Sequence, residues 1–276
     1  MPLLKKDDGH IYYNVQGQGA PIVLLRGLGR SSRYWLGFDR TLAKHFTVIT
    51  LDARGLGRTS IKASWLNAIK ENADDVVSIL DHLEIESAHI FGLSLGGMVA
   101  FHLCQHHRSR VESAIVANTS TADYMGLRIN PLALARLISP LSSETFQKRL
   151  VNVLVGKELS ETKKIETSKR WQKIIEKEGF PLTTIGKQLL SASRFKIGKS
   201  GTLPFIPVAI LYGEDDLFVP KHNSLKLDKV ISQARAYRIE KAGHEITVGN
   251  QKVLIETIVS FVENQRLDKK IHAMPF

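Results

Sequence analysis

The sequence has little of what marks a disulfide-bonded or membrane-embedded protein. Cys104 is the only cysteine among 276 residues, so no disulfide can form within the chain. No run of apolar residues approaches the length of about 18 that a membrane-spanning helix needs. The first ten residues, MPLLKKDDGH, contain no apolar stretch of signal-peptide length. These absences predict a cytoplasmic protein without a membrane span.

The sequence also lacks the motifs of nucleic-acid-binding proteins, although its formal net charge is +11. It has no zinc-finger spacing, no aromatic RNA-binding motif and no basic region followed by heptads. Residues 121–203 hold 15 Lys and Arg against 7 Asp and Glu, and this segment therefore carries +8 of the +11 charges. A solvated basic surface and the steering of an anionic substrate are both open as explanations, but nucleic acid is not an expected partner.

Short apolar or β-branched segments alternate with helical patterns along the chain. The expected strands are 11–15, 22–25, 46–51, 88–91, 113–117, 207–212 and 236–239. Several are apolar at every position, which is typical of parallel strands covered on both faces. This alternation predicts an α/β protein with a mostly parallel, doubly wound sheet.

The alternation is interrupted once, in residues 121–203, where only helical patterns such as 144–155 and 163–178 occur. We expect residues 1–120 and 204–276 to form the core domain and residues 121–203 to form an inserted helical cap. Some large apolar side chains of the cap are expected to line a substrate pocket. The candidates are Tyr124, Leu132, Leu137, Phe146, Trp171 and Phe180.

The pentapeptide Gly92-Leu93-Ser94-Leu95-Gly96 lies between a predicted strand and a predicted helix. A serine flanked by glycines at a strand-to-helix turn is typical of a nucleophile elbow. Only small residues fit beside so sharp a turn, and the turn exposes the hydroxyl at the helix N-terminus. Ser94 is therefore a candidate nucleophile.

Two later segments supply the partners that a nucleophilic serine needs. Residues 212–220, YGEDDLFVP, place Asp215 and Asp216 on a turn after a strand. Residues 242–245, AGHE, place His244 on the loop after the last predicted strand. A histidine can take the serine proton and a carboxylate can orient the histidine.

On these segments the chain resembles the α/β-hydrolase superfamily over nearly its whole length. Residues 8–25 are similar to the first hairpin of that family, and residues 51–60, LDARGLGRTS, to its D-x-R-G-x-G-x-S loop. The resemblance implies an α/β-hydrolase fold with Ser94, Asp216 and His244 as the catalytic residues, in the order that this fold uses. The family's G-x-x-D motif favours Asp216 over its neighbour as the acid.

The resemblance also implies an oxyanion hole formed by the backbone N–H groups of Leu28 and Leu95. The family usually has His-Gly before this loop, whereas this chain has Arg26-Gly27. A backbone donor survives a change of side chain, so catalysis is still expected. Two interpretations of Arg26 stay open: it anchors the loop, or its charge acts on the substrate.

A serine at position 94 disfavours dehalogenase and epoxide-hydrolase chemistry, for which the related families use aspartate. Residues 92–98, GLSLGGM, are similar to the elbow of carboxylesterases and 3-oxoadipate enol-lactonases. The resemblance implies hydrolysis of a small ester, lactone or thioester, with an anionic substrate as one option and without a cofactor or metal. A carbon–carbon bond hydrolase and a non-enzymatic ligand receptor on the same fold remain alternatives, and the oligomeric state is open.

Two other patterns are weaker. Residues 198–200, GKS, lack the first glycine and the preceding strand of a phosphate-binding loop. His102 and His106 lie one helical turn apart, but the segment lacks the glutamate of a zinc protease. We interpret His102 and His106 as surface or packed histidines, and Cys104 as a small buried apolar residue.

Overall fold

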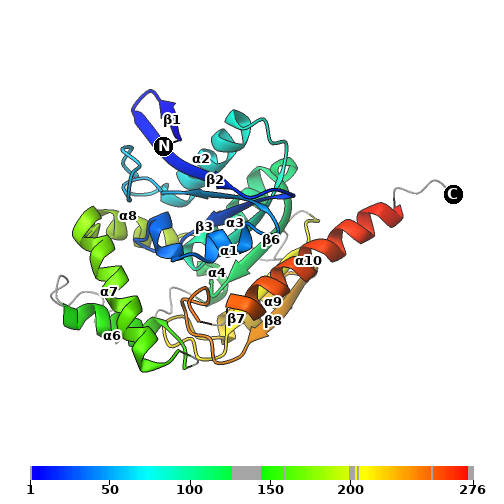
Figure 1. Ribbon diagram of the computed structural model, residues 1–276. Coiled ribbons are helices and arrows are strands. Elements are labelled where there is room, and N and C mark those ends of the chain that lie inside the picture. The colour runs from blue at the N-terminus through cyan, green and yellow to red at the C-terminus, as the bar shows by residue number, and fades with distance from the viewer. Residues whose placement is uncertain are drawn as a thin grey trace.

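The computed structural model describes residues 2–125, 144–157, 159–198, 203, 205–249 and 251–272 (Figure 1). An eight-stranded sheet lies at its centre, with the strand order β1-β2-β4-β3-β5-β6-β7-β8. The strands are β1 (Leu3–Lys6), β2 (Gly9–Gln16), β3 (Pro21–Leu25), β4 (Thr47–Leu51), β5 (Ala88–Leu93), β6 (Val111–Ala117), β7 (Val208–Gly213) and β8 (Ala234–Ile239).

Strand direction follows from the connections. β1 and β2 form an antiparallel hairpin, and β2 also runs antiparallel to β4. β3 pairs in parallel with both β4 and β5, and every further pairing out to β8 is parallel. Parallel neighbours need long crossover connections, which helices supply here. The prediction of a mostly parallel α/β sheet is confirmed.

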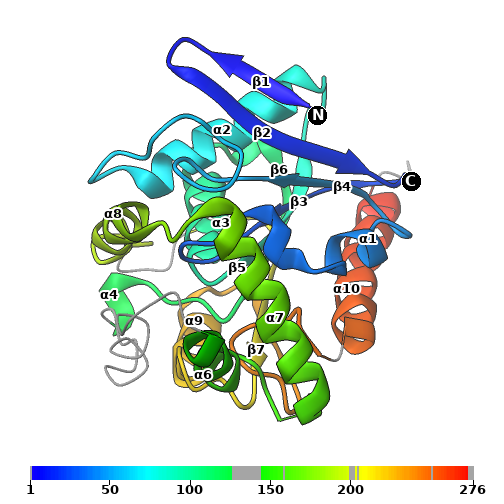
Figure 2. The same ribbon diagram turned by 60° about the vertical axis from the view of Figure 1, so that its left-hand side comes forward.

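Helices cover both faces of the sheet (Figure 2). Helices α2 (Ala68–His82), α3 (Leu95–His106) and α9 (His222–Val230) pack on one face, and α1 (Phe38–Leu42) and α10 (Gln251–His272) on the other. Short 3₁₀ helices η1 (Ser32–Trp35) and η2 (Arg108–Arg110) join some of these elements. The arrangement is doubly wound, as the alternation of elements predicts.

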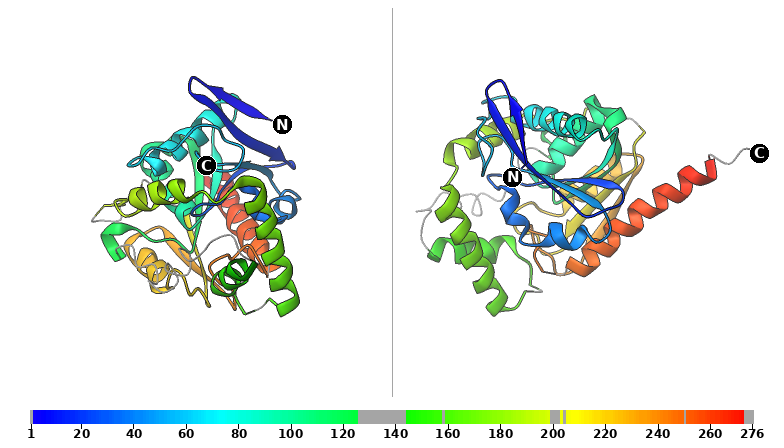
Figure 3. Two further views of the ribbon diagram at one scale, coloured as in Figure 1. Left: turned by 90° about the vertical axis from the view of Figure 1, so that its left-hand side faces the viewer. Right: turned by 45° about the horizontal axis from the view of Figure 1, so that its top comes forward.

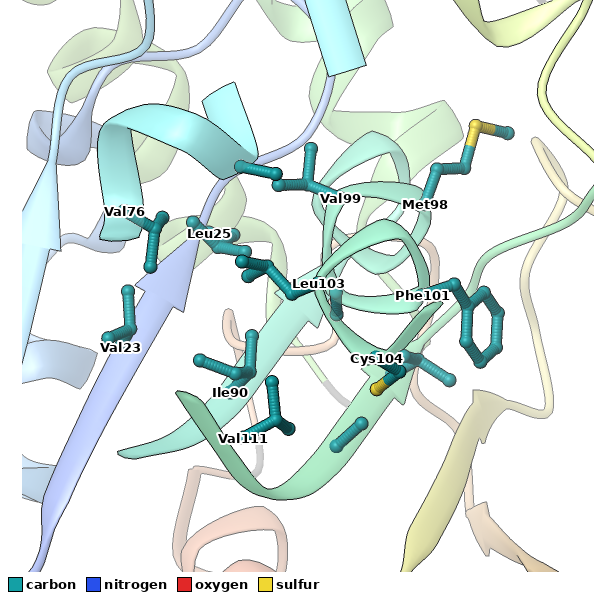
Figure 4. Close-up of a cluster of buried hydrophobic side chains, with 14 of the residues drawn as sticks. Val23, Leu25, Val76, Ile90, Met98, Val99, Phe101, Leu103, Cys104 and Val111 are labelled. Carbon is teal, nitrogen blue, oxygen red and sulfur yellow. The ribbon is translucent and has the colours of Figure 1, made fainter. Parts of the chain in front are cut away.

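Helix α3 is buried along most of its length. Figure 4 shows Leu103 pointing toward Leu25, and both side chains belong to the hydrophobic cluster between α2, α3 and the sheet. Truncating a fully buried leucine to alanine costs about 2–5 kcal/mol of stability. Cys104 on this helix is also fully buried, and burial raises the pKa of its thiol to about 12. It is a packed apolar residue, as predicted.

Helices α4 (Ala122–Met125), α6 (Glu144–Leu154), α7 (Glu161–Glu178) and α8 (Leu182–Ala192) lie between β6 and β7 in the chain. Figures 1 and 3 show α6, α7 and α8 on the side of the molecule opposite the free end of α10. The Leu154 carbonyl accepts from the Glu245 N–H at 2.7 Å, and Gln188 Oε1 accepts from the Gly29 N–H at 2.8 Å. These helices therefore contact the loops that follow β8 and β3.

No helix in the described part of the chain is long and apolar enough to cross a membrane.

Candidate active site

Ser94 stands at a strained turn between β5 and α3. Its backbone has φ 56° and ψ −116°, a conformation that residues with a side chain rarely adopt. The Ser94 N–H donates to the Ala117 carbonyl at 2.8 Å, and the Ser94 carbonyl accepts from Gly97 N–H at 2.9 Å and Thr119 Oγ1 at 2.8 Å. Neighbouring groups thus hold the strained serine in place.

The elbow needs glycine at positions 92 and 96, because a backbone carbonyl lies too close to each of them to leave room for a Cβ. A Cβ on Gly92 would overlap the Gly96 carbonyl, and a Cβ on Gly96 would overlap the Leu25 carbonyl. The turn therefore has the geometry of a nucleophile elbow, with Ser94 immediately before the first turn of α3.

Asp216 and His244 contact each other, although 28 residues separate them. His244 Nδ1 lies 2.9 Å from Asp216 Oδ2, and the two side chains are 5% and 1% exposed. The other oxygen, Asp216 Oδ1, accepts from the N–H groups of Phe218 and Val219, each at 2.8 Å. Both oxygens of the carboxylate are engaged, so its orientation toward the imidazole is fixed.

Asp215 has a different partner. Its Oδ1 lies 3.6 Å from Lys157 Nζ, an exposed amine. The neighbour that contacts His244 is therefore Asp216, the residue chosen on the G-x-x-D motif.

Asn118 holds the loop that carries His244. Its Nδ2 donates to the carbonyls of Gly243 at 3.0 Å and His244 at 2.8 Å, and its Oδ1 accepts from Gly213 N–H at 2.8 Å. Asn118 has φ 47°, a left-handed conformation that asparagine tolerates better than most residues. Asn118 was not among the expected site residues, and the signal that could have identified it is an asparagine directly after a buried strand.

Ser94, Leu28 and Leu95 line one pocket. Leu95 is the first residue of α3, so its N–H has no partner within the helix. Phe218 lines the same pocket, and its ring packs edge-on against His244 with centroids 4.8 Å apart. The remaining lining residues are mostly apolar: Met98, Asn118, Thr119, Ser120, Leu189, Ala192 and Val219.

Only two of the cap residues expected to line the pocket, Trp171 and Phe180, have side chains that the structure describes. Tyr124, Leu132, Leu137 and Phe146 lie outside the side chains that the structure describes. Trp171 and Phe180 pack in a separate apolar cluster around Tyr34. Leu189 and Ala192 of α8 do line the pocket. Neither was among the expected residues, because the pattern over 182–192 was not singled out as a helix.

Arg26 has a protein carboxylate as its partner. Its Nη2 donates to both carboxylate oxygens of Glu245, at 2.9 and 2.8 Å, and its guanidinium lies over the Trp35 ring. Arg26 is not among the described residues that line the pocket with Ser94. This geometry favours the interpretation that Arg26 anchors its loop.

Metal ligation finds no support in the described part of the chain, where no group of three or more His, Cys, Asp or Glu side chains is arranged around a possible ion. The rings of His102 and His106 lie 4.3 Å apart. Burial, together with the nearby His106 and His107, lowers the pKa of His102 to about 4.

The chain resembles known proteins in both sequence and fold. A family model described as alpha/beta hydrolase fold matches residues 20–250. The pimeloyl-[acyl-carrier protein] methyl ester esterase of Aeromonas hydrophila is 27% identical over 252 residues, which cover 89% of this chain and 96% of that protein.

Two solved structures extend the comparison. Est816, described as an N-acyl homoserine lactone degrading enzyme, matches with a TM-score of 0.79 and 26% identity, covering 94% of this chain and all of its own. A variant of CumD, a meta-cleavage product hydrolase, matches with a TM-score of 0.80 over 95% of this chain and 98% of its own. At 21% identity, the likeness to CumD shows the fold alone.

Proposed function

The chain belongs to the alpha/beta hydrolase fold family, and we propose that it is a serine hydrolase of a small carboxylic ester, lactone or thioester. One observation carries the proposal: the pocket lined by the strained elbow serine is also lined by Phe218, whose ring packs on His244, the buried partner of Asp216. Phe218 also donates its N–H to Asp216.

In the proposed acylation step, Ser94 Oγ attacks the carbonyl carbon of the substrate while His244 Nε2 takes the hydroxyl proton. Asp216 accepts the Nδ1–H of the imidazole, which holds the ring in the required tautomer and stabilises the imidazolium. His244 then gives its proton to the leaving alcohol or thiol as the carbonyl–oxygen or carbonyl–sulfur bond breaks.

The tetrahedral intermediate carries its negative charge on the former carbonyl oxygen. The N–H groups of Leu28 and Leu95 donate to this oxygen, and the N-terminus of α3 adds its favourable dipole. In the second half of the reaction, water attacks the acyl-enzyme with His244 again acting as the base. His244 then returns this proton to Ser94 Oγ as the acyl–oxygen bond breaks, which frees the serine hydroxyl and the acid. The proposed steps use no cofactor or metal.

We also propose that residues 121–203 act as a helical cap over a core formed by residues 1–120 and 204–276. The contacts of α6 and α8 with the loops after β8 and β3 support this division. Leu189 and Ala192 of α8 line the pocket beside Ser94, so the cap would select the substrate. A cytoplasmic location stays a prediction.

Relatives support ester and lactone substrates over the alternatives. The Aeromonas relative is described as a methyl ester esterase and Est816 as a lactone-degrading enzyme, and both exceed 25% identity. Carbon–carbon bond hydrolysis on the same triad is the second candidate, and CumD, described as a meta-cleavage product hydrolase, shares the fold. A receptor that keeps the triad for ligand binding is the non-enzymatic alternative.

Replacement of the nucleophile tests the proposal. Ser94→Ala should abolish fluorophosphonate labelling and lower kcat on an ester and lactone panel by about 10⁶-fold. The exposed Ser232→Ala variant serves as the matched control and should retain both. Near-wild-type turnover in Ser94→Ala would show that the mechanism is wrong. A wild-type protein that is labelled, cleaves no ester or lactone and hydrolyses a vinylogous 1,5-diketone would favour the carbon–carbon alternative.

A further inference from the structure

Three buried charged side chains join the two loops on which the proposed chemistry depends. Arg26 directly precedes Gly27-Leu28, and Glu245 directly follows His244. Arg26 Nη2 lies 2.9 and 2.8 Å from the two Glu245 oxygens, and Arg30 Nε lies 3.1 Å from Oε1. Their side chains are only 2–9% exposed. These contacts connect the oxyanion loop (residues 26–30) to the histidine loop (residues 242–245).

Aromatic rings fix both guanidinium groups. The Arg26 guanidinium carbon lies 4.5 Å from the centre of the Trp35 ring. That of Arg30 lies 4.5 Å from the Tyr34 ring and 4.0 Å from the Trp171 ring. Cation–π contacts strengthen when water is excluded, and planar groups packed in this way have little freedom to reorient. The cluster is therefore rigid as well as buried.

The cluster is not what stability alone would select. It places two cations against one anion, and Arg26 Nε, Arg26 Nη1 and Arg30 Nη1 have no hydrogen-bond partner within the described part of the chain. Burial alone would raise the pKa of Glu245, but the charges of Arg26 and Arg30 hold it below its usual value. Apolar side chains of similar volume often replace a buried ion pair without loss of stability.

On the basis of the proposed hydrolase function, we propose that Arg26 and Glu245 are positioning residues that set the Leu28 N–H and the His244 ring relative to each other. Neither touches the substrate. Arg26 acts through Leu28, two positions along the same loop, and Glu245 acts through the adjacent His244. A misplacement of about 1 Å between catalytic groups can cost on the order of 100-fold in rate. Loss of the Arg26–Glu245 ion pair should therefore lower kcat more than it weakens substrate binding.

The decisive variant replaces all three charges of the cluster. Arg26→Met and Arg30→Met combined with Glu245→Leu leave no ion of the cluster unpaired, so the protein should remain folded. We expect kcat on a p-nitrophenyl ester and the rate of fluorophosphonate labelling to fall about 10- to 100-fold, with KM within about twofold. Arg26→Lys keeps the charge without the planar fork, and it should recover part of kcat.

A second, partly buried Arg–Glu pair offers a matched control. Arg33 Nε lies 2.7 Å from Glu178 Oε1, and this pair joins η1 to α7. Arg33→Met combined with Glu178→Leu should change the urea-unfolding midpoint at most, with kcat within about twofold of wild type.

The outcomes separate the two proposals. A wild-type protein that neither hydrolyses esters nor reacts with fluorophosphonate would overturn the proposed function. An active wild type together with a folded Arg26→Met, Arg30→Met, Glu245→Leu variant of unchanged kcat would overturn only the positioning role. Loss of kcat in proportion to the unfolded fraction, measured by titrating labelled Ser94, would also overturn it, because the pair would then be merely structural.

Discussion

Asp215 and Asp216 are adjacent and chemically identical, yet they face different partners. Asp216 is almost fully buried and uses both oxygens, whereas Asp215 lies near the exposed Lys157 amine. The turn after β7 determines this difference, because successive side chains on it point in different directions. The motif favoured Asp216, and the hydrogen bond to His244 supplies the physical reason for that choice.

Substitution of the two aspartates should give unequal effects. Asp216→Asn should lower kcat by about 10⁴-fold, because the amide no longer stabilises the imidazolium and favours the wrong tautomer. Asp215→Asn removes only a long contact to an exposed lysine and should change kcat by less than about twofold. Steady-state kinetics on one ester will compare them, and a reversed ranking would move the triad acid to position 215.

His102 makes stability depend on pH. Its pKa is about 4 in the folded protein and 6.5 as the ordinary value, so the unfolded chain takes up this proton first as pH falls. Between these values the unfolded state binds more protons, and this residue therefore lowers stability progressively from about pH 6.5 toward pH 4. His102→Gln should reduce the acid sensitivity of the urea-unfolding midpoint. The exposed Ser232→Ala variant changes no titratable group and should leave this sensitivity unchanged, and equal slopes for both variants would contradict the prediction.

The elbow and helix α8 show opposite constraints on glycine. Gly96 lies in the first turn of α3, where a Cβ would overlap the Leu25 carbonyl of β3. Gly186 lies inside α8, where a Cβ would meet only Trp65 Cζ3 at 3.8 Å, an ordinary contact distance. The same residue type is thus required by packing in one helix and tolerated in another.

Alanine substitution should separate these two glycines. Gly96→Ala should destabilise the protein by about 1–3 kcal/mol, because backbone atoms of β3 cannot move aside easily. Gly186→Ala should stabilise it by about 0.4–1 kcal/mol through the lower entropy of the unfolded chain. Urea-unfolding midpoints will measure both, and a neutral Gly96→Ala would show that the elbow is less tightly packed than the structure indicates.

Segments with strong periodicity were predicted better than segments without it. The seven expected strands match β2 to β8 within a few residues, because continuous apolar runs report burial directly. β1, with the sequence LLKK, is short and partly exposed and was not expected. Helix α10 continues through the largely polar residues after 265 to His272. Composition reports burial and does not by itself mark where a helix ends.

The charge distribution of the whole molecule leads to a further prediction. The +8 segment at residues 121–203 includes helices that contact the loops around the pocket, so anionic substrates should reach the site faster than neutral ones. Such steering acts on encounter and weakens with salt, since the Debye length is about 8 Å at 0.15 M ionic strength.

A pair of esters tests the steering. A neutral and a carboxylate-bearing ester of the same acyl group should differ in kcat/KM at low ionic strength, and the preference for the anionic ester should shrink as salt is added. Parallel salt dependence of the two esters would leave the basic segment as ordinary solvated surface.

The sequence by itself determined the parts of this protein that depend on local order. Alternating strands and helices predicted the sheet, and the glycines around Ser94 predicted the elbow, because each reflects the geometry of neighbouring residues. Asp216 and His244 were assigned through the family resemblance, and their hydrogen bond is visible only in the structure.

Contacts between distant loops were decided by the tertiary structure alone. Arg26 and Glu245 are 219 residues apart, and nothing in either segment identifies the other as its partner. They meet because β3 and β8 end at the same edge of the sheet, where the loops that follow both strands pack against the inserted helices. Leu189 reaches the pocket for the same reason, since α8 is placed by contacts with Gly29 and its neighbours. Periodicity reports which face of an element is buried, whereas packing decides what that face meets.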